Sequence, residues 1–192
     1  LIDGDQILYV LAREFLRTGR LQGAVVGTEM SNLGLEHALA AQGIGFERAP
    51  VGDRHVMDLL RRGGGVLGGE PSGHIICLDR TTTGDGIVAA LQVLGVMAAT
   101  GRPLQDLVAA MPRYPQELIN VPVSDARAVA RHPKLQRAIQ ESLQALGREG
   151  RVVLRPSGTE PLLRVMVEGA DPEAVRVHVR RLAGIADDCV MP

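Results

Sequence analysis

The sequence of 192 residues has no tryptophan and only four other aromatic residues, two tyrosines and two phenylalanines. Proteins that bind single-stranded nucleic acid stack the bases on aromatic rings, and many sugar sites stack a pyranose in the same way. Such sites are therefore not expected here, and a bound sugar would be held by polar groups. The formal net charge is −1, so no basic field attracts a nucleic acid partner.

Cysteines and long apolar runs are also scarce. The two cysteines, Cys77 and Cys189, cannot form a disulfide framework, and their small number suits a reducing cytosol. No apolar run approaches the ~20 residues that span a bilayer. The first residues carry no basic-then-apolar signal pattern. We therefore expect a cytoplasmic protein with no membrane partner. Because Leu1 is not methionine and a structured pattern follows at once, we expect a piece of a longer protein.

The composition is that of a globular protein, with 45% hydrophobic and 22% charged residues. The length allows one ordinary domain or two small ones. Pro112, Pro115 and Pro122 lie close together, and this cluster indicates a boundary between domains of residues 1–111 and 112–192.

Apolar spacing predicts the elements of each domain. In the first, short strands alternate with helices, which indicates an α/β layered domain with a mixed or mainly parallel sheet. In the second, the order strand, helix, strand, strand, helix indicates a small α+β domain with an antiparallel sheet. The predicted helices are 7–17, 33–41, 54–62, 87–99, 104–111, 134–146 and 171–186, and the predicted strands are 23–28, 45–49, 66–67, 75–78, 117–123, 151–155 and 162–168.

The segment that joins the last two predicted strands is a candidate phosphate site. Arg155 offers a planar fork for a phosphate, Ser157 and Thr159 offer hydroxyl groups, and Gly158 lets backbone N–H groups approach an anion. Arg164, just beyond the loop, adds a second charge. The alternative is a solvated hairpin turn, in which Ser, Gly and Pro are common. That alternative leaves the two prolines and the flanking arginines unexplained, so we favour phosphate binding.

A second glycine-rich loop, residues 68–74, is a candidate sugar site. Glu70 is an acceptor for sugar hydroxyls and Ser72 can donate and accept. His74 could hydrogen-bond a phosphate or move a proton near neutral pH. The alternative is an ordinary glycine-rich loop with one exposed carboxylate, and the residue types alone do not separate the two.

Asp53 and Arg54 precede a predicted helix. Asp53 is most simply a helix N-cap, although Arg54 could reach an anion at that helix start. Ser31 and Asn32 follow a buried strand, at the kind of strand end where α/β proteins bind ligands.

Two pairs of residues resemble metal sites but lack the further ligands that a metal ion needs. Asp3 and Asp5 form a short carboxylate pair without a third ligand, and capping of the first helix explains them better. His74 and Cys77 have no partner pair at zinc spacing. The sequence therefore predicts no metal ligands, and it offers no nucleophile with an adjacent base.

Four motifs, VGDRHV, GGEPSGH, TTTGDG and RPSGTEPLLRVMVEG, occur in this order from residue 51 to residue 169. In sequence and spacing they resemble the C-terminal half of the α-D-phosphohexomutases, over nearly the whole chain and nearest to the glucosamine branch. The resemblance implies domains three and four of a four-domain enzyme. It also implies that Glu70, Ser72 and His74 bind the sugar, that the Arg155 loop holds the phosphate that is not reacting, and that Asp53 and Arg54 face the substrate.

The family resemblance implies an isomerase that interconverts glucosamine 6-phosphate and glucosamine 1-phosphate. The reaction uses a phosphoserine, Mg²⁺ and a 1,6-bisphosphate intermediate, on the route to UDP-N-acetylglucosamine. The serine and the Mg²⁺ loop belong to the family's first two domains, and neither motif occurs here, so we expect them upstream and expect this piece alone to be inactive. The expected partners are the phosphosugar, the missing N-terminal domains and, in the full-length enzyme, a second copy as a homodimer. Phosphomannomutase or phosphoglucomutase activity, or a non-catalytic phosphosugar-binding module, remains open.

Overall fold

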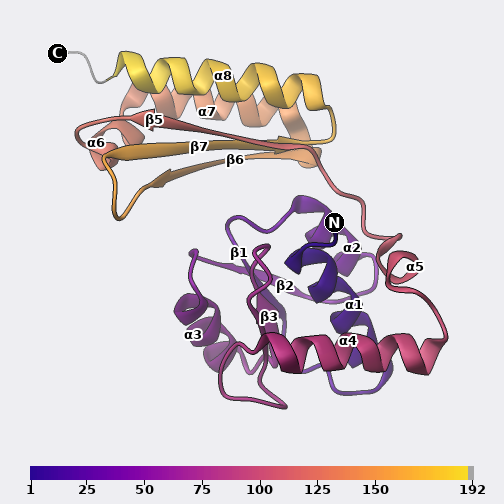
Figure 1. Cartoon of the computed structure of the whole chain (residues 1–192). Coiled ribbons are helices and arrows are strands. Elements are labelled where there is room, and N and C mark those ends of the chain that lie inside the picture. Colours follow the sequence, from indigo (N-terminus) through magenta and orange to yellow (C-terminus); the bar gives the residue numbers. More distant parts are fainter. Residues whose placement is uncertain (190–192) are drawn as a thin grey trace. The chain divides into compact units, whose positions relative to one another are not determined.

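The computed structural model describes residues 1–189, which form two compact units, Leu1–Arg113 and a second that begins at Tyr114. Figure 1 shows helices alternating with short strands in the first unit. None of the helices in the described residues is both long and apolar enough to cross a membrane. The elements of the first unit are α1 (Gly4–Arg17), β1 (Val25–Thr28), α2 (Leu33–Ala40), β2 (Phe46–Ala49), α3 (Asp53–Gly63), β3 (Leu67–Gly69), β4 (Ile75–Cys77), α4 (Gly86–Thr100) and α5 (Leu104–Val108).

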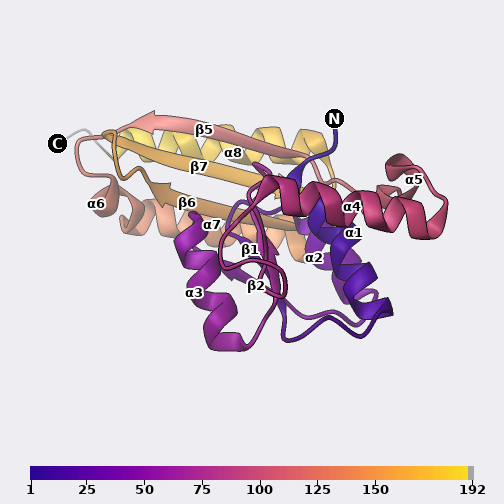
Figure 2. The ribbon, with the colours of Figure 1, turned by 60° about the horizontal axis from the view of Figure 1, so that its bottom comes forward.

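The sheet of the first unit has the strand order β2-β1-β3-β4. β1 pairs in parallel with β2 and β3, and β3 pairs antiparallel with β4. Alternate residues of β1 face opposite sides of the sheet: Val25 packs into a large apolar cluster with α1, α2, α4 and α5, whereas Val26 packs into a smaller one with α3. Figure 2 shows α3 across the sheet from α1 and α4, so the unit has three layers.

The first helix begins earlier than the apolar spacing predicted. Asp3, not Asp5, is its N-cap, because the Asp3 side chain accepts a hydrogen bond from the Gln6 backbone N–H and the Gln6 side chain accepts one from the Asp3 N–H. This reciprocal pair is a capping box, and it starts the helix at Gly4. Asp5 therefore lies inside the first turn, where it is buried.

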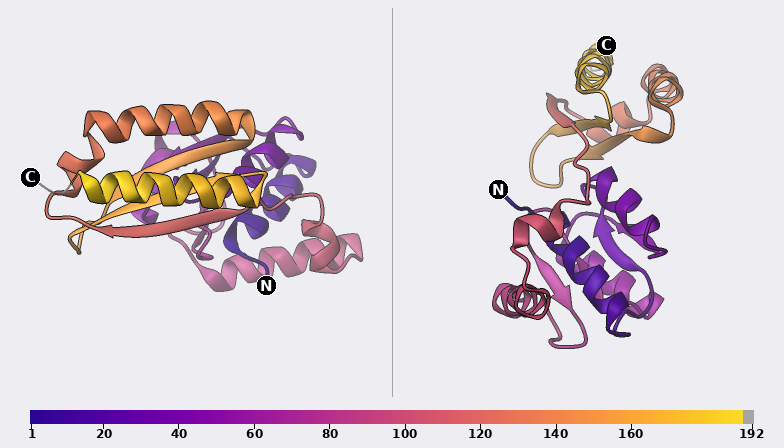
Figure 3. Two further views of the ribbon diagram at one scale, coloured as in Figure 1. Left: turned by 90° about the horizontal axis from the view of Figure 1, so that it is seen from above. Right: turned by 90° about the vertical axis from the view of Figure 1, so that its right-hand side faces the viewer.

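The second unit is a three-stranded antiparallel sheet in the order β5-β7-β6. Figure 3 shows α7 and α8 on one face of this sheet, and Leu163 and Val165 of β7 point into the apolar cluster beneath them. The elements are β5 (Gln116–Pro122), α6 (Ala126–Ala130), α7 (Pro133–Leu146), a 3-10 turn (Gly147–Glu149), β6 (Gly150–Pro156), β7 (Leu162–Gly169) and α8 (Pro172–Asp188). The predicted fold class, a mixed α/β layered domain followed by a small antiparallel α+β domain, is confirmed.

The short helix α6 was not predicted. Val129 is its one buried residue, so the segment has no apolar repeat from which a helix could be predicted. Asp125 caps the helix, because its side chain accepts hydrogen bonds from the N–H groups of Arg127 and Ala128. Pro122 lies in β5, which is an edge strand. An edge position tolerates a residue that cannot donate to the sheet.

Candidate functional site

In the first unit, the loop between β3 and β4 is tied to the start of α3. One carboxylate oxygen of Glu70, Oε1, accepts a hydrogen bond from the Gly52 backbone N–H at 3.1 Å. The loop is closed on itself, because the Glu70 N–H donates to the His74 carbonyl at 3.0 Å and the Gly73 N–H donates to the Glu70 carbonyl at 2.9 Å. Gly73 has φ +99°, a backbone conformation that favours glycine.

His74 lies beside Asp53. Its Nε2 is 3.9 Å from Asp53 Oδ2, too far for a hydrogen bond, and this nitrogen is buried with no hydrogen-bond partner in the described part of the chain. Gly84 lies against the imidazole ring, since a Cβ at that position would come within 1.9 Å of Nε2. The structure therefore brings together Glu70, His74 and Asp53, three of the residues predicted to face a ligand.

Asp53 does not have the capping role that the sequence favoured. The N-cap of α3 is Gly52, which makes no side-chain cap hydrogen bond. Asp53 occupies the first helical position, and its Oδ1 accepts from the Arg54 N–H at 2.8 Å. A carboxylate in the first turn of a helix is favoured by the helix dipole. The Asp53 side chain is 59% exposed and its other oxygen faces His74.

An open hollow of about 400 Å³ lies beside this loop. Ser72 and His74 line one side, and the segment from Gly84 to Gly86 at the start of α4 lines the other. Asp85 caps α4 by accepting hydrogen bonds from the N–H groups of Ile87 and Val88. The end of the TTTGDG segment thus begins α4 and also lines this hollow.

The start of α1 supports the same loop. The Gly4 N–H donates to the Pro71 carbonyl at 2.9 Å, and a Cβ at Gly4 would come within 2.0 Å of the Glu70 carbonyl oxygen and 2.8 Å of the Gly73 nitrogen. No predicted role of Gly4 pointed to this contact. The absence of a side chain at Gly4 allows the helix and the loop to touch.

A Gly4→Ala substitution should therefore displace the Glu70 loop. Overpacking of this kind costs about 1–3 kcal/mol, and we expect thermal unfolding to shift to lower temperature. Gly63→Ala is a matched control, because nothing lies within 4 Å of a Cβ there. Thermal denaturation of the two variants checks the prediction, and equal unfolding temperatures would contradict the close contact.

Ser31 and Asn32 have structural roles in this fold. Both are buried. The Asn32 side chain caps α2 by accepting from the Gly34 N–H at 3.0 Å, and the Asn32 N–H donates to Asp5 Oδ2 at 2.7 Å. Burial raises the pKa of the Asp5 carboxyl to about 6, although the Asn32 and Ser31 hydrogen bonds oppose the rise. These buried residues hold the end of β1 against α1.

In the second unit, the predicted phosphate loop connects β6 to β7. The Ser157 N–H donates to the Leu162 carbonyl at 2.9 Å, and Ser157 Oγ accepts from the Glu160 N–H at 3.3 Å. The Ser157 hydroxyl proton can still be donated to a ligand. Gly158 and Thr159 are exposed at the tip of the loop, and nothing lies within 4 Å of a Cβ built at Gly158.

Arg155 and Arg164 lie directly opposite each other on β6 and β7. Like charges in this position are destabilising. The Nε atoms of both arginines are buried and have no hydrogen-bond partner among the described residues. A buried N–H left unpaired costs about 1–3 kcal/mol. Glu160 compensates part of this charge, since its carboxylate is 3.6 Å from Arg164 Nη2. An anion beside this pair would supply the missing acceptors.

Asn120 was not predicted as a site residue. It lies opposite Arg164 on β5, so Asn120, Arg164 and Arg155 form a row across the sheet. The row is on the face opposite the helices, because the neighbouring residue Leu163 packs beneath them. The only signal available was the strand period, which places Asn120 on one face of its strand without identifying its neighbour.

The described residues do not fit a metal ion. No group of three metal-ligating side chains occurs among them. The Asp3 carboxylate accepts a hydrogen bond from the Gln6 N–H, and its Oδ2 lies 3.2 Å from Arg113 Nη2. The Asp5 carboxylate accepts a hydrogen bond from the Asn32 N–H. We therefore assign no step of a reaction to a metal held by this chain.

Comparison with known proteins matches most of the chain to one family. Residues 3–114 match the family described as Phosphoglucomutase/phosphomannomutase, alpha/beta/alpha domain III, and residues 118–184 match the Phosphoglucomutase/phosphomannomutase C-terminal domain. A phosphoglucosamine mutase of Halorhodospira halophila is 61% identical over 170 residues, which is 88% of this chain and 37% of that protein. One of Thioalkalivibrio sulfidiphilus is 57% identical, over 95% of this chain and 41% of that protein. The chain spans about two fifths of the length of these relatives.

Solved structures have the same fold. The N-acetylphosphoglucosamine mutase of Aspergillus fumigatus, determined with GlcNAc-6P and magnesium, superposes with a TM-score of 0.82 at 22% identity, over 96% of this chain and 47% of that one. A phosphoglucomutase/phosphomannomutase family protein of Burkholderia thailandensis gives a TM-score of 0.78 at 20% identity, over 99% of this chain and 43% of that one. At these identities the likeness concerns the fold alone.

Proposed function

This chain belongs to the phosphoglucomutase/phosphomannomutase family, and from that premise we propose that it is the substrate-recognition half of a phosphoglucosamine mutase. Its substrate would be glucosamine 6-phosphate or glucosamine 1-phosphate. The high identity to two phosphoglucosamine mutases supports this choice of sugar. We expect the full-length enzyme to act in the cytoplasm, on the route to UDP-N-acetylglucosamine.

The observation that carries the proposal is the pair of arginines on β6 and β7. Arg155 and Arg164 face each other with buried Nε atoms that have no hydrogen-bond partner in the part of the chain that the structure describes. They lie next to a loop that offers the hydroxyls of Ser157 and Thr159. Guanidinium groups bind phosphate through two parallel N–H bonds. We propose that this cluster holds the phosphate that does not react.

The sugar would be bound by the loop between β3 and β4. Glu70 Oε1 is occupied by the Gly52 N–H, which fixes the carboxylate and leaves its second oxygen to accept from sugar hydroxyls. Ser72 would make a further hydrogen bond at the hollow. His74 Nε2, which has no hydrogen-bond partner among residues 1–189, would contact the substrate. We propose that Asp53 and Arg54 also face the substrate.

In the full-length enzyme, a phosphoserine outside this chain would transfer its phosphoryl group to O1 of glucosamine 6-phosphate, which forms the 1,6-bisphosphate. After the sugar turns round, the phosphoryl group on O6 would return to the serine and leave glucosamine 1-phosphate. A clamp that grips whichever phosphate is idle serves both half-reactions. The contribution of this chain is to position the substrate and to neutralise its charge.

The test is calorimetry of the 192-residue chain with glucosamine 1-phosphate. We expect binding that Glu70→Gln weakens by tenfold or more, because the variant replaces a charged acceptor by a neutral amide. Equal affinities of the two proteins would contradict the role of Glu70.

Two alternatives are separated by further assays. A phosphomannomutase or phosphoglucomutase would prefer mannose or glucose phosphates when the full-length enzyme is assayed with all three sugars. A non-catalytic phosphosugar-binding module would bind these ligands, but the full-length gene product would lack a serine and metal loop upstream of this segment.

Gly158 provides a test in which stability and binding are expected to separate. A Cβ there meets nothing within 4 Å, so Gly158→Ala should leave the free energy of unfolding unchanged or raise it by up to ~1 kcal/mol. If a phosphate lies against this backbone, the added methyl group should weaken glucosamine 1-phosphate binding severalfold. Urea denaturation and calorimetry measure the two effects, and unchanged affinity would place the phosphate elsewhere.

A further inference from the structure

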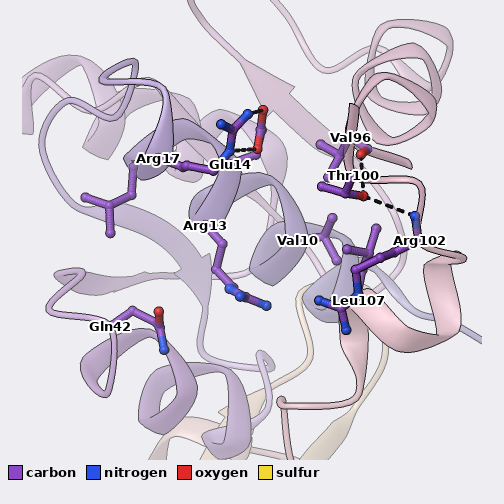
Figure 4. Close-up of a pocket in the computed structure, with 10 residues that line it drawn as sticks. Val10, Arg13, Glu14, Arg17, Gln42, Val96, Thr100, Arg102 and Leu107 are labelled. Carbon is purple, nitrogen blue, oxygen red and sulfur yellow. Dashed lines mark hydrogen bonds and ion pairs between the residues drawn. The ribbon is translucent and has the colours of Figure 1, made fainter. Parts of the chain in front are cut away.

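A second hollow in the first unit is lined by the arginines Arg13, Arg17 and Arg102. Its volume is about 290 Å³, and it lies among α1, α4 and the turn into α5. Figure 4 shows its lining, with Arg13 and Arg102 directed toward the same space.

The positive charge of this hollow is only partly neutralised. Arg17 forms a bidentate ion pair with Glu14, with hydrogen bonds of 2.8 and 2.7 Å. The Glu14 carboxylate is therefore already paired. Arg13 lies over the Tyr9 ring, 5.4 Å from its centroid, and Arg102 donates to the Asp106 carbonyl at 3.0 Å. Neither arginine has a carboxylate partner in the described part of the chain. Within residues 1–189, the guanidinium groups of Arg13 and Arg102 therefore face this hollow without an ion pair of their own.

The floor of the hollow is apolar. Val10, Val96 and Leu107 are each at least nine-tenths buried, whereas Gln42 and Thr100 offer polar groups at the rim. An inorganic anion would satisfy the arginines but leave the apolar floor in water. A ligand with both an anionic group and an apolar body would satisfy both, since apolar area removed from water also stabilises the complex.

The hollow is separate from the sugar loop. α1 touches that loop through Gly4 at its N-terminal end and lines the hollow through Arg13 and Arg17 near its C-terminal end. Ten residues of helix separate Gly4 from Glu14, or about 15 Å along the axis at 1.5 Å per residue. α4 likewise begins beside His74 and ends at this hollow.

We propose that this hollow is a second ligand site, which binds a small amphiphilic anion through Arg13 and Arg102. The anionic group, a phosphate monoester or a carboxylate, would accept hydrogen bonds from the two guanidinium groups. The apolar part would lie on Val10, Val96 and Leu107. The inference is independent of the proposed function, because none of these residues belongs to the sugar or phosphate loop.

The test uses phenyl phosphate as a probe of the 192-residue chain, followed by amide chemical shifts in NMR spectra. We expect the amides of Gln42, Thr100 and Arg102 to shift in a saturable way. Inorganic phosphate has the anionic group without the apolar body, and benzyl alcohol has the apolar body without the anionic group. Each should bind at these residues at least tenfold more weakly than phenyl phosphate.

The variants Arg13→Gln and Arg102→Gln should each weaken this response at least tenfold. Arg61→Gln, at an exposed position on α3, should leave it unchanged. No saturable shift in these amides, or equal affinity in all variants, would overturn the proposal. Shifts confined to Ser157 and Thr159 would also overturn it, while supporting the phosphate loop of the proposed function.

Discussion

An Arg155→Gln variant should bind glucosamine 1-phosphate tenfold to a hundredfold more weakly than the unmodified chain does. A hydrogen bond to a charged group contributes about 1.5–3 kcal/mol, and tenfold in affinity corresponds to about 1.4 kcal/mol. Glutamine keeps a polar but shorter side chain and removes both the charge and the planar fork. Because the Arg155 Nε has no hydrogen-bond partner within residues 1–189, the folded state should lose little when the guanidinium is removed.

The matched control is Arg127→Gln, which removes an exposed arginine of α6 in the same unit. Calorimetry should give it the affinity of the unmodified chain. Removing Arg164 as well as Arg155 should cost less than the sum of the two single losses, because both side chains would hold one phosphate. Equal affinities of Arg155→Gln and the unmodified chain would show that the phosphate is not held by this loop.

An Asp5→Asn variant should remove a pH dependence of stability. Burial raises the pKa of the Asp5 carboxyl from 3.8 to about 6. The folded chain therefore keeps a proton that the unfolded chain has already lost, and stability falls as the pH rises through this window. The full effect is about 3 kcal/mol, since each pKa unit corresponds to 1.36 kcal/mol.

Urea denaturation at two pH values measures this effect. Relative to Asp5→Asn, the unmodified chain should lose about 2 kcal/mol of unfolding free energy between about pH 4.5 and about pH 7.5. Asparagine keeps an oxygen that can accept from the Asn32 N–H and carries no charge, so the comparison cancels the other carboxylates. Parallel pH curves for the two proteins would mean that Asp5 titrates at an ordinary pKa.

Much of the fold followed from short-range patterns. The apolar periods predicted every strand and all α-helices except α6. Helix starts did not follow from the same patterns, because they depend on side-chain caps rather than on periodicity. The capping box of Asp3 and Gln6 was present in the sequence, but Asp5 has the same residue type and competed for the same role.

The contacts that build the site could not be predicted from the sequence, because they join segments that are far apart along the chain. Glu70 is held by Gly52, 18 positions away, and Gly4 touches the Pro71 carbonyl. A glycine that allows two segments to touch, such as Gly4, leaves no periodic pattern in the sequence. The strand register that places Arg155 opposite Arg164 leaves none either. The sequence shows which residue types are present, but the partner of each side chain is set by the folded chain.

The most direct test of the central claim is a crystal structure of this chain with a hexose 1,6-bisphosphate. The account predicts one phosphate within hydrogen-bond distance of the Arg155 guanidinium and the hydroxyls of Ser157 and Thr159, with sugar hydroxyls on Glu70 and Ser72. A well-occupied ligand that contacts neither loop would contradict it.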